Sequence, residues 1–202
     1  MIKAIIFDFG RVISAQKPAS LFSIYENDLG LEPGTINSIM FNSKAWKDAL
    51  LGSKTVEEFW EEIGPQLNLN SRTEIDAFRR RYHADEAVNH SVVNLLQRLY
   101  GRYKLAVLSN SPPGLSQWLA DWNLLYLFDT VFCSGDEGVV KPEPAAFKIT
   151  LQRLAVEPEE AVFVDDTMEH VEASLKMGLQ GILFTTGEPL EEELGGLLGK
   201  DF

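Results

Sequence analysis

Several polar side chains follow short apolar segments of this 202-residue chain, and their types suit the handling of a phosphoryl group. Asp8 and Ser109 each end such a segment, Asp165 and Asp166 follow a third, and Lys141 begins the segment Lys-Pro-Glu-Pro. A carboxylate can act as a nucleophile, a hydroxyl can donate to a phosphate oxygen, and an ammonium group supplies a compact positive charge. Each residue also has a plainer interpretation, as a turn residue, a helix cap or a solvated lysine, so none of them establishes the chemistry alone.

The adjacent carboxylates of Asp165 and Asp166 are the residues best suited to binding a metal ion. Two like charges at the end of an apolar strand are costly unless a cation is bound. Mg²⁺ is the simplest such cation, because it prefers oxygen ligands and accepts one or two protein carboxylates together with phosphate and water. One of the two could instead cap a helix that starts near Met168, which would leave the other free to bind metal.

The elements that must position these residues are short apolar runs rich in Val, Ile and Phe. We expect buried strands at residues 4–9, 105–108, 130–133, 161–164 and 181–184. The segments between them have apolar residues at helical spacing, and this alternation predicts a Rossmann-like, doubly wound α/β fold with a parallel sheet. Ligands of such sheets lie beyond the carboxyl ends of the strands, so Asp8, Ser109 and Asp165 should meet there.

Residues 14–83 break the alternation. This stretch has no convincing strand, and its apolar residues recur at helical spacing. We predict a helical cap over residues 14–83, inserted after the first strand and overhanging the site as a lid, and a catalytic core formed by residues 1–13 and 84–202.

Composition limits the partners. The chain is 45% hydrophobic, which is enough for a substantial core, and its formal net charge is −12. Without a dense run of Lys or Arg, nucleic acid and anionic membranes are not expected as partners, and no apolar stretch is long enough to span a bilayer. Cys133 is the only cysteine, so no internal disulfide can form, in keeping with the cytoplasm; we interpret it as a buried strand residue.

Taken in order, the segments around Asp8, Ser109, Lys141 and Asp165–Asp166 resemble the four motifs of the haloacid dehalogenase superfamily. The long insert after the first motif is similar to that of its capped members. The resemblance implies that Asp8 is the nucleophile and forms an aspartyl-phosphate. It further implies that Lys141 and Ser109 bind the phosphate of a small phosphorylated substrate, while Asn110 either orients the substrate or caps the following turn.

The same resemblance supplies a set of Mg²⁺ ligands. Asp8, the backbone carbonyl of Gly10 and Asp166 would bind the metal directly, and Asp165 would help through water or through Lys141. Arg11, beside the nucleophile, could touch the substrate, latch the cap or be an ordinary surface residue.

The first motif departs from the pattern of most phosphatases of the superfamily, which carry a second Asp two residues after the nucleophile as general acid and base. Gly10 occupies that position here, and positioned proton transfer typically contributes ~10²–10⁴-fold to the rate. His170 is a second departure, because related sequences commonly have Asn there; we expect a structural role for it.

Three functions are compatible with a first motif that lacks the second Asp. The chain could be a phosphatase, resembling a sugar-phosphate branch in which Gly is ordinary at this position. It could be a metal-independent 2-haloacid dehalogenase, or a non-catalytic relative that binds phosphate or a partner. Because dehalogenases usually lack the paired acidic motif, Asp165 and Asp166 favour the magnesium-dependent phosphatase.

Overall fold

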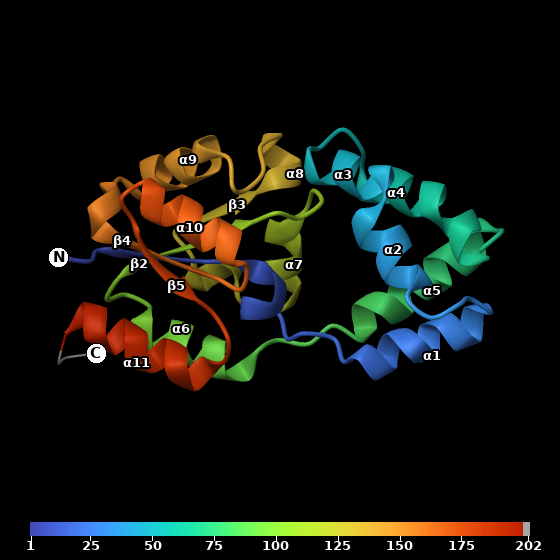
Figure 1. The fold of residues 1–202 in the computed structure, drawn as a ribbon, viewed down its shortest axis with the longest axis horizontal. Coiled ribbons are helices and arrows are strands. Elements are labelled where there is room, and N and C mark those ends of the chain that lie inside the picture. Colours follow the sequence, from blue (N-terminus) through green and yellow to red (C-terminus); the bar gives the residue numbers. More distant parts are fainter. Residues whose placement is uncertain (200–202) are drawn as a thin grey trace.

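A computed structural model describes residues 1–199 and contains a five-stranded parallel sheet in the order β3-β2-β1-β4-β5 (Figure 1). The strands are β1 (Ala4–Phe7), β2 (Lys104–Ser109), β3 (Thr130–Cys133), β4 (Ala161–Asp165) and β5 (Gln180–Leu183). The expected strands and the doubly wound α/β fold are therefore confirmed. The first strand is shorter than expected, because the chain enters a short helical turn, η1 (Phe9–Ile13), directly after Asp8.

Helices cover both faces of the sheet, as the near-continuous apolar strands require. Side chains alternate along β1, so Ile5 and Phe7 pack with the helices of one face while Ala4 and Ile6 pack with those of the other. The first face is covered by α6 (His90–Leu99), α7 (Leu115–Asp121) and α11 (Gly187–Leu198). The second is covered by α9 (Pro144–Leu154) and α10 (Met168–Lys176).

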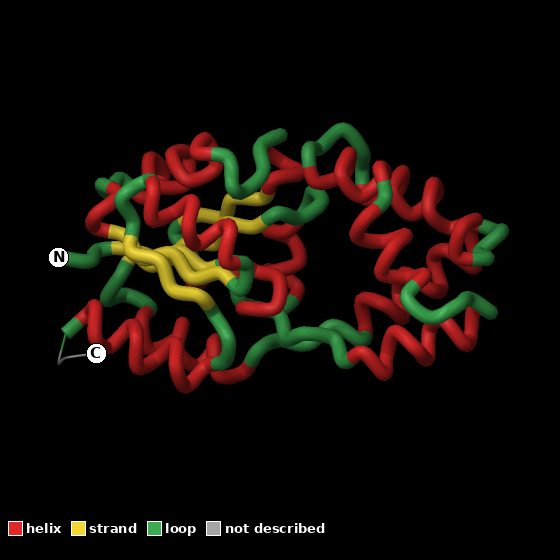
Figure 2. Tube along the Cα trace, in the orientation of Figure 1, coloured by secondary structure: helices red, strands yellow, loops and turns green. Residues whose placement is uncertain are grey.

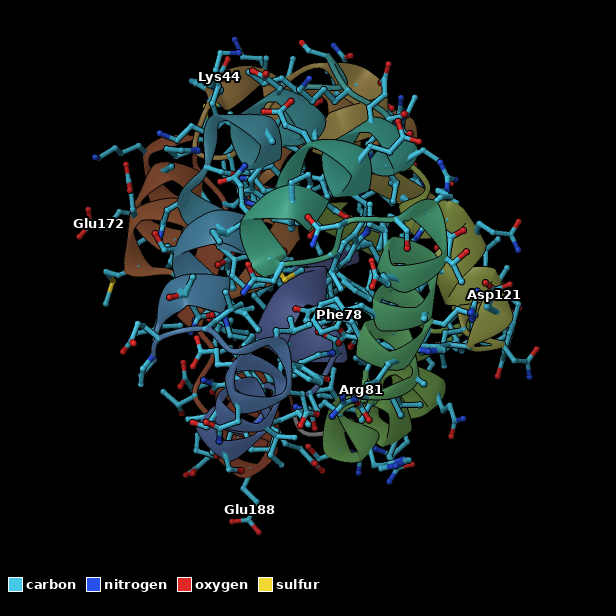
Figure 3. The ribbon with its side chains drawn as sticks, turned by 90° about the vertical axis from the view of Figure 1, so that its right-hand side faces the viewer. Lys44, Phe78, Arg81, Asp121, Glu172 and Glu188 are labelled. Carbon is cyan, nitrogen blue, oxygen red and sulfur yellow. The ribbon has the colours of Figure 1, made fainter. Side chains whose placement is uncertain are left out.

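A separate group of helices follows η1 and contains no strand, as expected for the insert (Figure 2). Its members are α1 (Ala19–Leu29), α2 (Thr35–Asn42), α3 (Lys44–Leu50), α4 (Val56–Ile63), η2 (Gly64–Leu67) and α5 (Arg72–Ala84). They bury their own apolar cluster, rich in aromatic rings, with Phe78 near the middle of the bundle (Figure 3). Ser71 and Glu74 form a capping box that starts α5, so local sequence fixes this helix boundary.

Besides a ring contact between His83 of α5 and Trp118 of α7, whose centroids lie 5.1 Å apart, this bundle meets the sheet-bearing part at two places. At the first, the two connecting segments run side by side, with an isolated bridge between Ser14 and Val88 and a 2.5 Å ion pair between Lys17 and Glu86. At the second, α3 and the loop after it lie against α8 (Ser134–Glu137) (Figure 1). A Cβ atom at Gly52 would lie 2.3 Å from the backbone oxygen of Gly135, so the two backbones are in direct contact there.

We expect Gly52→Ala to loosen the second contact. Gly52 has φ +68°, so Ala is strained there, and its Cβ would also collide with α8. Gly34→Ala is the matched control, because Gly34 has φ +85° but nothing within 4 Å of the added atom. Urea denaturation should show that the free energy of unfolding falls by about 1 kcal/mol in the control and by a clearly larger amount in Gly52→Ala. Equal losses would mean that the contact between α3 and α8 contributes nothing.

Candidate active site

The carboxyl ends of three neighbouring strands bring the predicted site residues together. Phe7 is paired with Val107 of β2 and with Val164 of β4, so Asp8 emerges between the two flanking strands. The backbone N–H of Asp8 donates to the carbonyl of Val164 at 2.8 Å, which extends the β1–β4 pairing by one residue. Asp8, Ser109 and Asp165, at successive strand ends, therefore share one edge of the sheet, where ligands of such sheets bind.

Lys141 is the central cation of this edge. Its Nζ lies 2.7 Å from Oδ1 of Asp8 and 2.6 Å from Oδ2 of Asp165. All three side chains are nearly inaccessible to solvent. Burial opposes the charge of Lys141, but the two carboxylates outweigh it and raise the pKa of the ammonium group, so it stays positive at neutral pH.

The two carboxylates beside Lys141 differ in their surroundings. Burial and the nearby charge of Asp165 raise the pKa of Asp8 above its usual value, against the opposing effects of Lys141 and of a hydrogen bond from Ser109. Burial also acts on Asp165, yet its pKa is lowered, because His170 and Lys141 both hydrogen-bond to its carboxylate. Asp8 is thus the carboxylate with the less compensated charge.

Both carboxylate oxygens of Asp165 are hydrogen-bonded to other residues of the protein. Its Oδ1 accepts the backbone N–H of Thr167 at 2.8 Å, and its Oδ2 accepts from Lys141. The Nδ1 atom of His170 lies 3.2 and 3.0 Å from the two oxygens. His170 lies in the first turn of α10, so its structural role consists in holding this carboxylate.

Asn110 has a role that neither sequence-based interpretation contained. Its Nδ2 donates to the backbone carbonyl of Lys141 at 2.8 Å, and its Oδ1 accepts the backbone N–H of Lys141 at 2.7 Å. Both polar ends of the amide are therefore used to fix the segment that carries the central lysine. Residue type and spacing alone do not reveal such a pairing over 31 positions.

The acidic residues form a group suited to a divalent cation. Ligand atoms of Asp8, Asp165 and Asp166 all lie within 4.8 Å of one another. Three carboxylates at this spacing, with the buried charge of Lys141 shared between two of them, leave negative charge that Mg²⁺ would balance with its preferred oxygen ligands. Asp166 is the more accessible of the pair and is bound by Arg11 at 2.9 Å, whereas Asp165 is fully buried. The donor set therefore fits the expected metal.

Gly10 does not occupy a conformation reserved for glycine. Its φ is −65° and its ψ is 123°, and a Cβ placed there would meet only Oδ2 of Asp8, at 3.8 Å. The unusual backbone lies one residue later, because Arg11 has φ +60°. The position of the missing acid could thus accept a side chain, which the sequence could not reveal.

Cys133 is the buried strand residue that the sequence predicted. It ends β3, and its thiol donates to the backbone carbonyls of Ser111 and Pro112. Burial, with a contribution from Asp136, raises the pKa of the thiol to about 11. A thiol with this pKa is a poor nucleophile at neutral pH.

Comparison with known proteins decides the family. A family model described as haloacid dehalogenase-like hydrolase matches residues 2–178. The chain belongs to this family. Its predicted membership and its enzyme class, a hydrolase, are thereby confirmed. None of the helices within residues 1–199 has the length and apolar character that a helix spanning a bilayer needs.

Individual relatives of this hydrolase have low sequence identity to it but align with almost the whole chain. Sesquiterpene phosphatase astK of Aspergillus oryzae is 27% identical over 98% of this chain and 97% of its own length. Drimenol cyclase drtB of Aspergillus calidoustus is 25% identical over 98% of this chain, which spans only 37% of that longer protein. The expected class, a phosphoric monoester hydrolase, is supported by the phosphatase relative.

A solved structure shares the fold of this hydrolase. It is a haloacid dehalogenase family enzyme of Bacteroides thetaiotaomicron, an aspartate-to-alanine variant in complex with magnesium and inorganic phosphate. The TM-score is 0.74 and the identity is 20%, over 93% of this chain and 96% of the other.

The buried ion pairs predict a large effect of Lys141→Met, which keeps the length of the side chain and removes its charge. Asp8 and Asp165 would lose their shared counter-charge, and breaking a buried pair in this way costs about 3–5 kcal/mol. Urea denaturation at pH 7 without metal should show this loss. The control is Lys148→Met on the exposed side of α9, which should change stability by less than about 0.5 kcal/mol. A loss for Lys141→Met as small as that of the control would contradict the assigned role of the ammonium group.

Proposed function

We propose that this hydrolase is a magnesium-dependent phosphatase that cleaves a small phosphorylated metabolite through an aspartyl-phosphate on Asp8. The observation that carries the proposal is the placement of Asp8, whose carboxylate lies against Lys141 and within a group of three carboxylates at the carboxyl edge of the sheet. Phosphoryl transfer needs alignment and charge neutralisation more than covalent help from the protein. This arrangement provides both.

Two displacements at phosphorus make up the reaction. A carboxylate oxygen of Asp8 attacks phosphorus, the bond from phosphorus to the leaving oxygen breaks, and that oxygen takes up a proton from solvent water because Gly10 carries no acid. A second water molecule then attacks the same phosphorus and releases a proton to solvent, the bond to Asp8 breaks, and the carboxylate is restored. Lys141 and Ser109 stabilise the phosphoryl oxygens during both steps. Magnesium, held by Asp8, Asp166 and the carbonyl of Gly10, would neutralise charge on these oxygens.

The helices of residues 14–83 act as the cap in this proposal, and residues 1–13 and 84–202 form the core, of which residues 200–202 lie outside the described part. The contacts at the connecting segments and at α8 support this assignment, because a cap attached there would overhang the strand ends and shield the reaction from water. Sugar phosphates are the first substrate candidates. The phosphatase relative adds phosphates carried on apolar skeletons, such as sesquiterpenoid phosphates, to the panel.

The absence of an acid at Gly10 is the observation that favours the second candidate, a metal-independent 2-haloacid dehalogenase. In that reaction Asp8 would attack carbon and displace halide, a leaving group that needs no proton. Against it stand Asp165 and Asp166, whose joint presence such chemistry does not require. A non-catalytic relative that binds phosphate or a partner is the third candidate.

The metal requirement tests the proposal directly. We expect phosphate release from aryl and sugar phosphates to require Mg²⁺ and to stop after chelation. Asp166→Asn should raise the Mg²⁺ concentration needed for half-maximal activity more than Asp165→Asn does, because Asp165 is already held by Lys141, Thr167 and His170. Asp121→Asn is the control, since Asp121 is exposed at the edge of the molecule (Figure 3).

Other outcomes would favour the other functions. Release of chloride from 2-chloropropionate without metal, with phosphate esters left intact, would establish the dehalogenase. Failure of both substrate classes, with a phosphate-dependent rise in thermal stability, would support a binding protein. The reverse order of the two Asn variants would overturn the assignment of Asp166 as the direct ligand.

Gly10→Asp should restore the missing acid and base. The backbone there suits any residue, and the new Cβ would lie near the carboxylate of Asp8. We expect kcat/KM to rise by about tenfold or more on alkyl phosphates, whose leaving group needs a proton, and to rise less on aryl phosphates. Gly10→Asn has the same shape without the acid and should give no such gain. An equal gain in both variants would show that shape, not proton transfer, is responsible.

A further inference from the structure

Arg11 has a backbone conformation that its residue type does not favour. Its φ is 60° and its ψ is 2°, in the left-handed region where Gly or Asn is the usual choice. The surrounding turn imposes this conformation: the N–H of Arg11 donates to Oγ of Ser14 at 3.1 Å, and the N–H of Ser14 donates to the carbonyl of Phe9 at 2.9 Å. A strained residue held in this way next to a reactive group suggests that its side chain has a function.

The side chain of Arg11 reaches the carboxylate that is least engaged by the rest of the protein. Its Nε lies 2.9 Å from Oδ2 of Asp166, and the Arg11 side chain is 58% exposed whereas that of Asp166 is 16% exposed. Asp166 otherwise accepts a 3.3 Å hydrogen bond from the hydroxyl of Thr167. The guanidinium group therefore lies at the open side of the carboxylate group and is free to change its position.

The charges at the site explain why such a change would occur. The ion pairs of Lys141 are with Asp8 and Asp165, whereas the cation paired with Asp166 is Arg11. A divalent cation bound to the carboxylates would compete with Arg11 for Asp166. A phosphate dianion arriving at the same place would then need a further positive partner, and a guanidinium group can bind phosphate with two parallel hydrogen bonds.

We propose that Arg11 is a substrate-binding residue that exchanges partners: it pairs with Asp166 in the metal-free protein and binds the phosphoryl oxygens of the substrate once magnesium occupies Asp166. The proposal rests on the phosphatase function above and adds the residue that couples metal binding to phosphate binding. Arg11 therefore opposes magnesium when phosphate is absent and assists phosphate when magnesium is present.

The test measures binding rather than turnover, by calorimetry with magnesium alone and then with inorganic phosphate at saturating magnesium. Arg11→Gln removes the charge and keeps a long polar side chain. We expect it to bind magnesium about two- to fivefold more tightly than the wild type, as for the loss of a partly exposed ion pair. We expect it to bind phosphate about tenfold more weakly, as for the loss of a charged hydrogen bond.

Three further variants make the test specific. Arg80→Gln, at an exposed position of α5, removes one positive charge away from the site and should change neither affinity. Arg11→Lys should recover part of the phosphate affinity, because it restores the charge without the fork. Arg11→Gly removes the backbone strain, so it should unfold at a higher temperature than Arg11→Gln while binding phosphate equally weakly.

Other results would separate a failure of the proposed function from a failure of this inference. A wild-type chain that binds neither magnesium nor phosphate would overturn both the proposed function and this inference. If the wild type binds both but Arg11→Gln matches it in phosphate affinity, the phosphatase function stands and the exchange of partners is refuted. The exchange of partners is also refuted, and the phosphatase function also stands, if Arg11→Gln binds magnesium more weakly than the wild type does.

Discussion

The ammonium group of Lys141 lies between the carboxylates of Asp8 and Asp165, out of contact with solvent, and the rest of the site is arranged around it. Burying three charged groups is expensive, and the cost is offset only when their geometry is good and the remaining oxygens are bonded. That geometry is supplied by β1 and β4 as neighbours, by Asn110 holding the backbone of Lys141, and by Thr167 and His170 on Asp165. Burial raises the pKa of Asp8 even though Lys141 opposes this, and Asp166 is paired with Arg11 instead of with the lysine. The three carboxylates around one buried lysine therefore leave negative charge that the proposed magnesium ion would balance.

The helical bundle is attached to this edge without sharing its core. It buries its own aromatic cluster. It meets the sheet-bearing part at the connecting segments, at the ring contact between His83 and Trp118, and at the backbone contact between Gly52 and Gly135. Inter-element contacts of this small extent permit relative motion more readily than a shared hydrophobic core does. The close backbone approach at Gly52 makes the contact with α8 specific, because a single methyl group there would interfere with it.

Sequence reasoning predicted the parts of this molecule that depend on local pattern. The apolar strands, the helical insert and the convergence of Asp8, Ser109 and Asp165 follow from periodicity and from the geometry of parallel sheets. The features that it missed depend on tertiary contacts. The two hydrogen bonds from Asn110 to Lys141 join residues far apart in the chain, and the left-handed turn at Arg11 is set by hydrogen bonds around it that residue type does not reveal. At Gly10 the sequence showed that the acid is missing, but not that the backbone there, with φ −65° and ψ 123°, would accept a side chain.

Covalent trapping measures whether Asp8 acts as a nucleophile toward phosphorus. The wild-type chain would be mixed with magnesium and a labelled aryl phosphate, quenched in acid within milliseconds, and digested for mass spectrometry. We expect a phosphorylated peptide containing Asp8 that forms and decays within the time of one turnover, and that is missing in Asp8→Asn. Turnover of the substrate with no label on Asp8 at any time point would refute a nucleophilic role of Asp8.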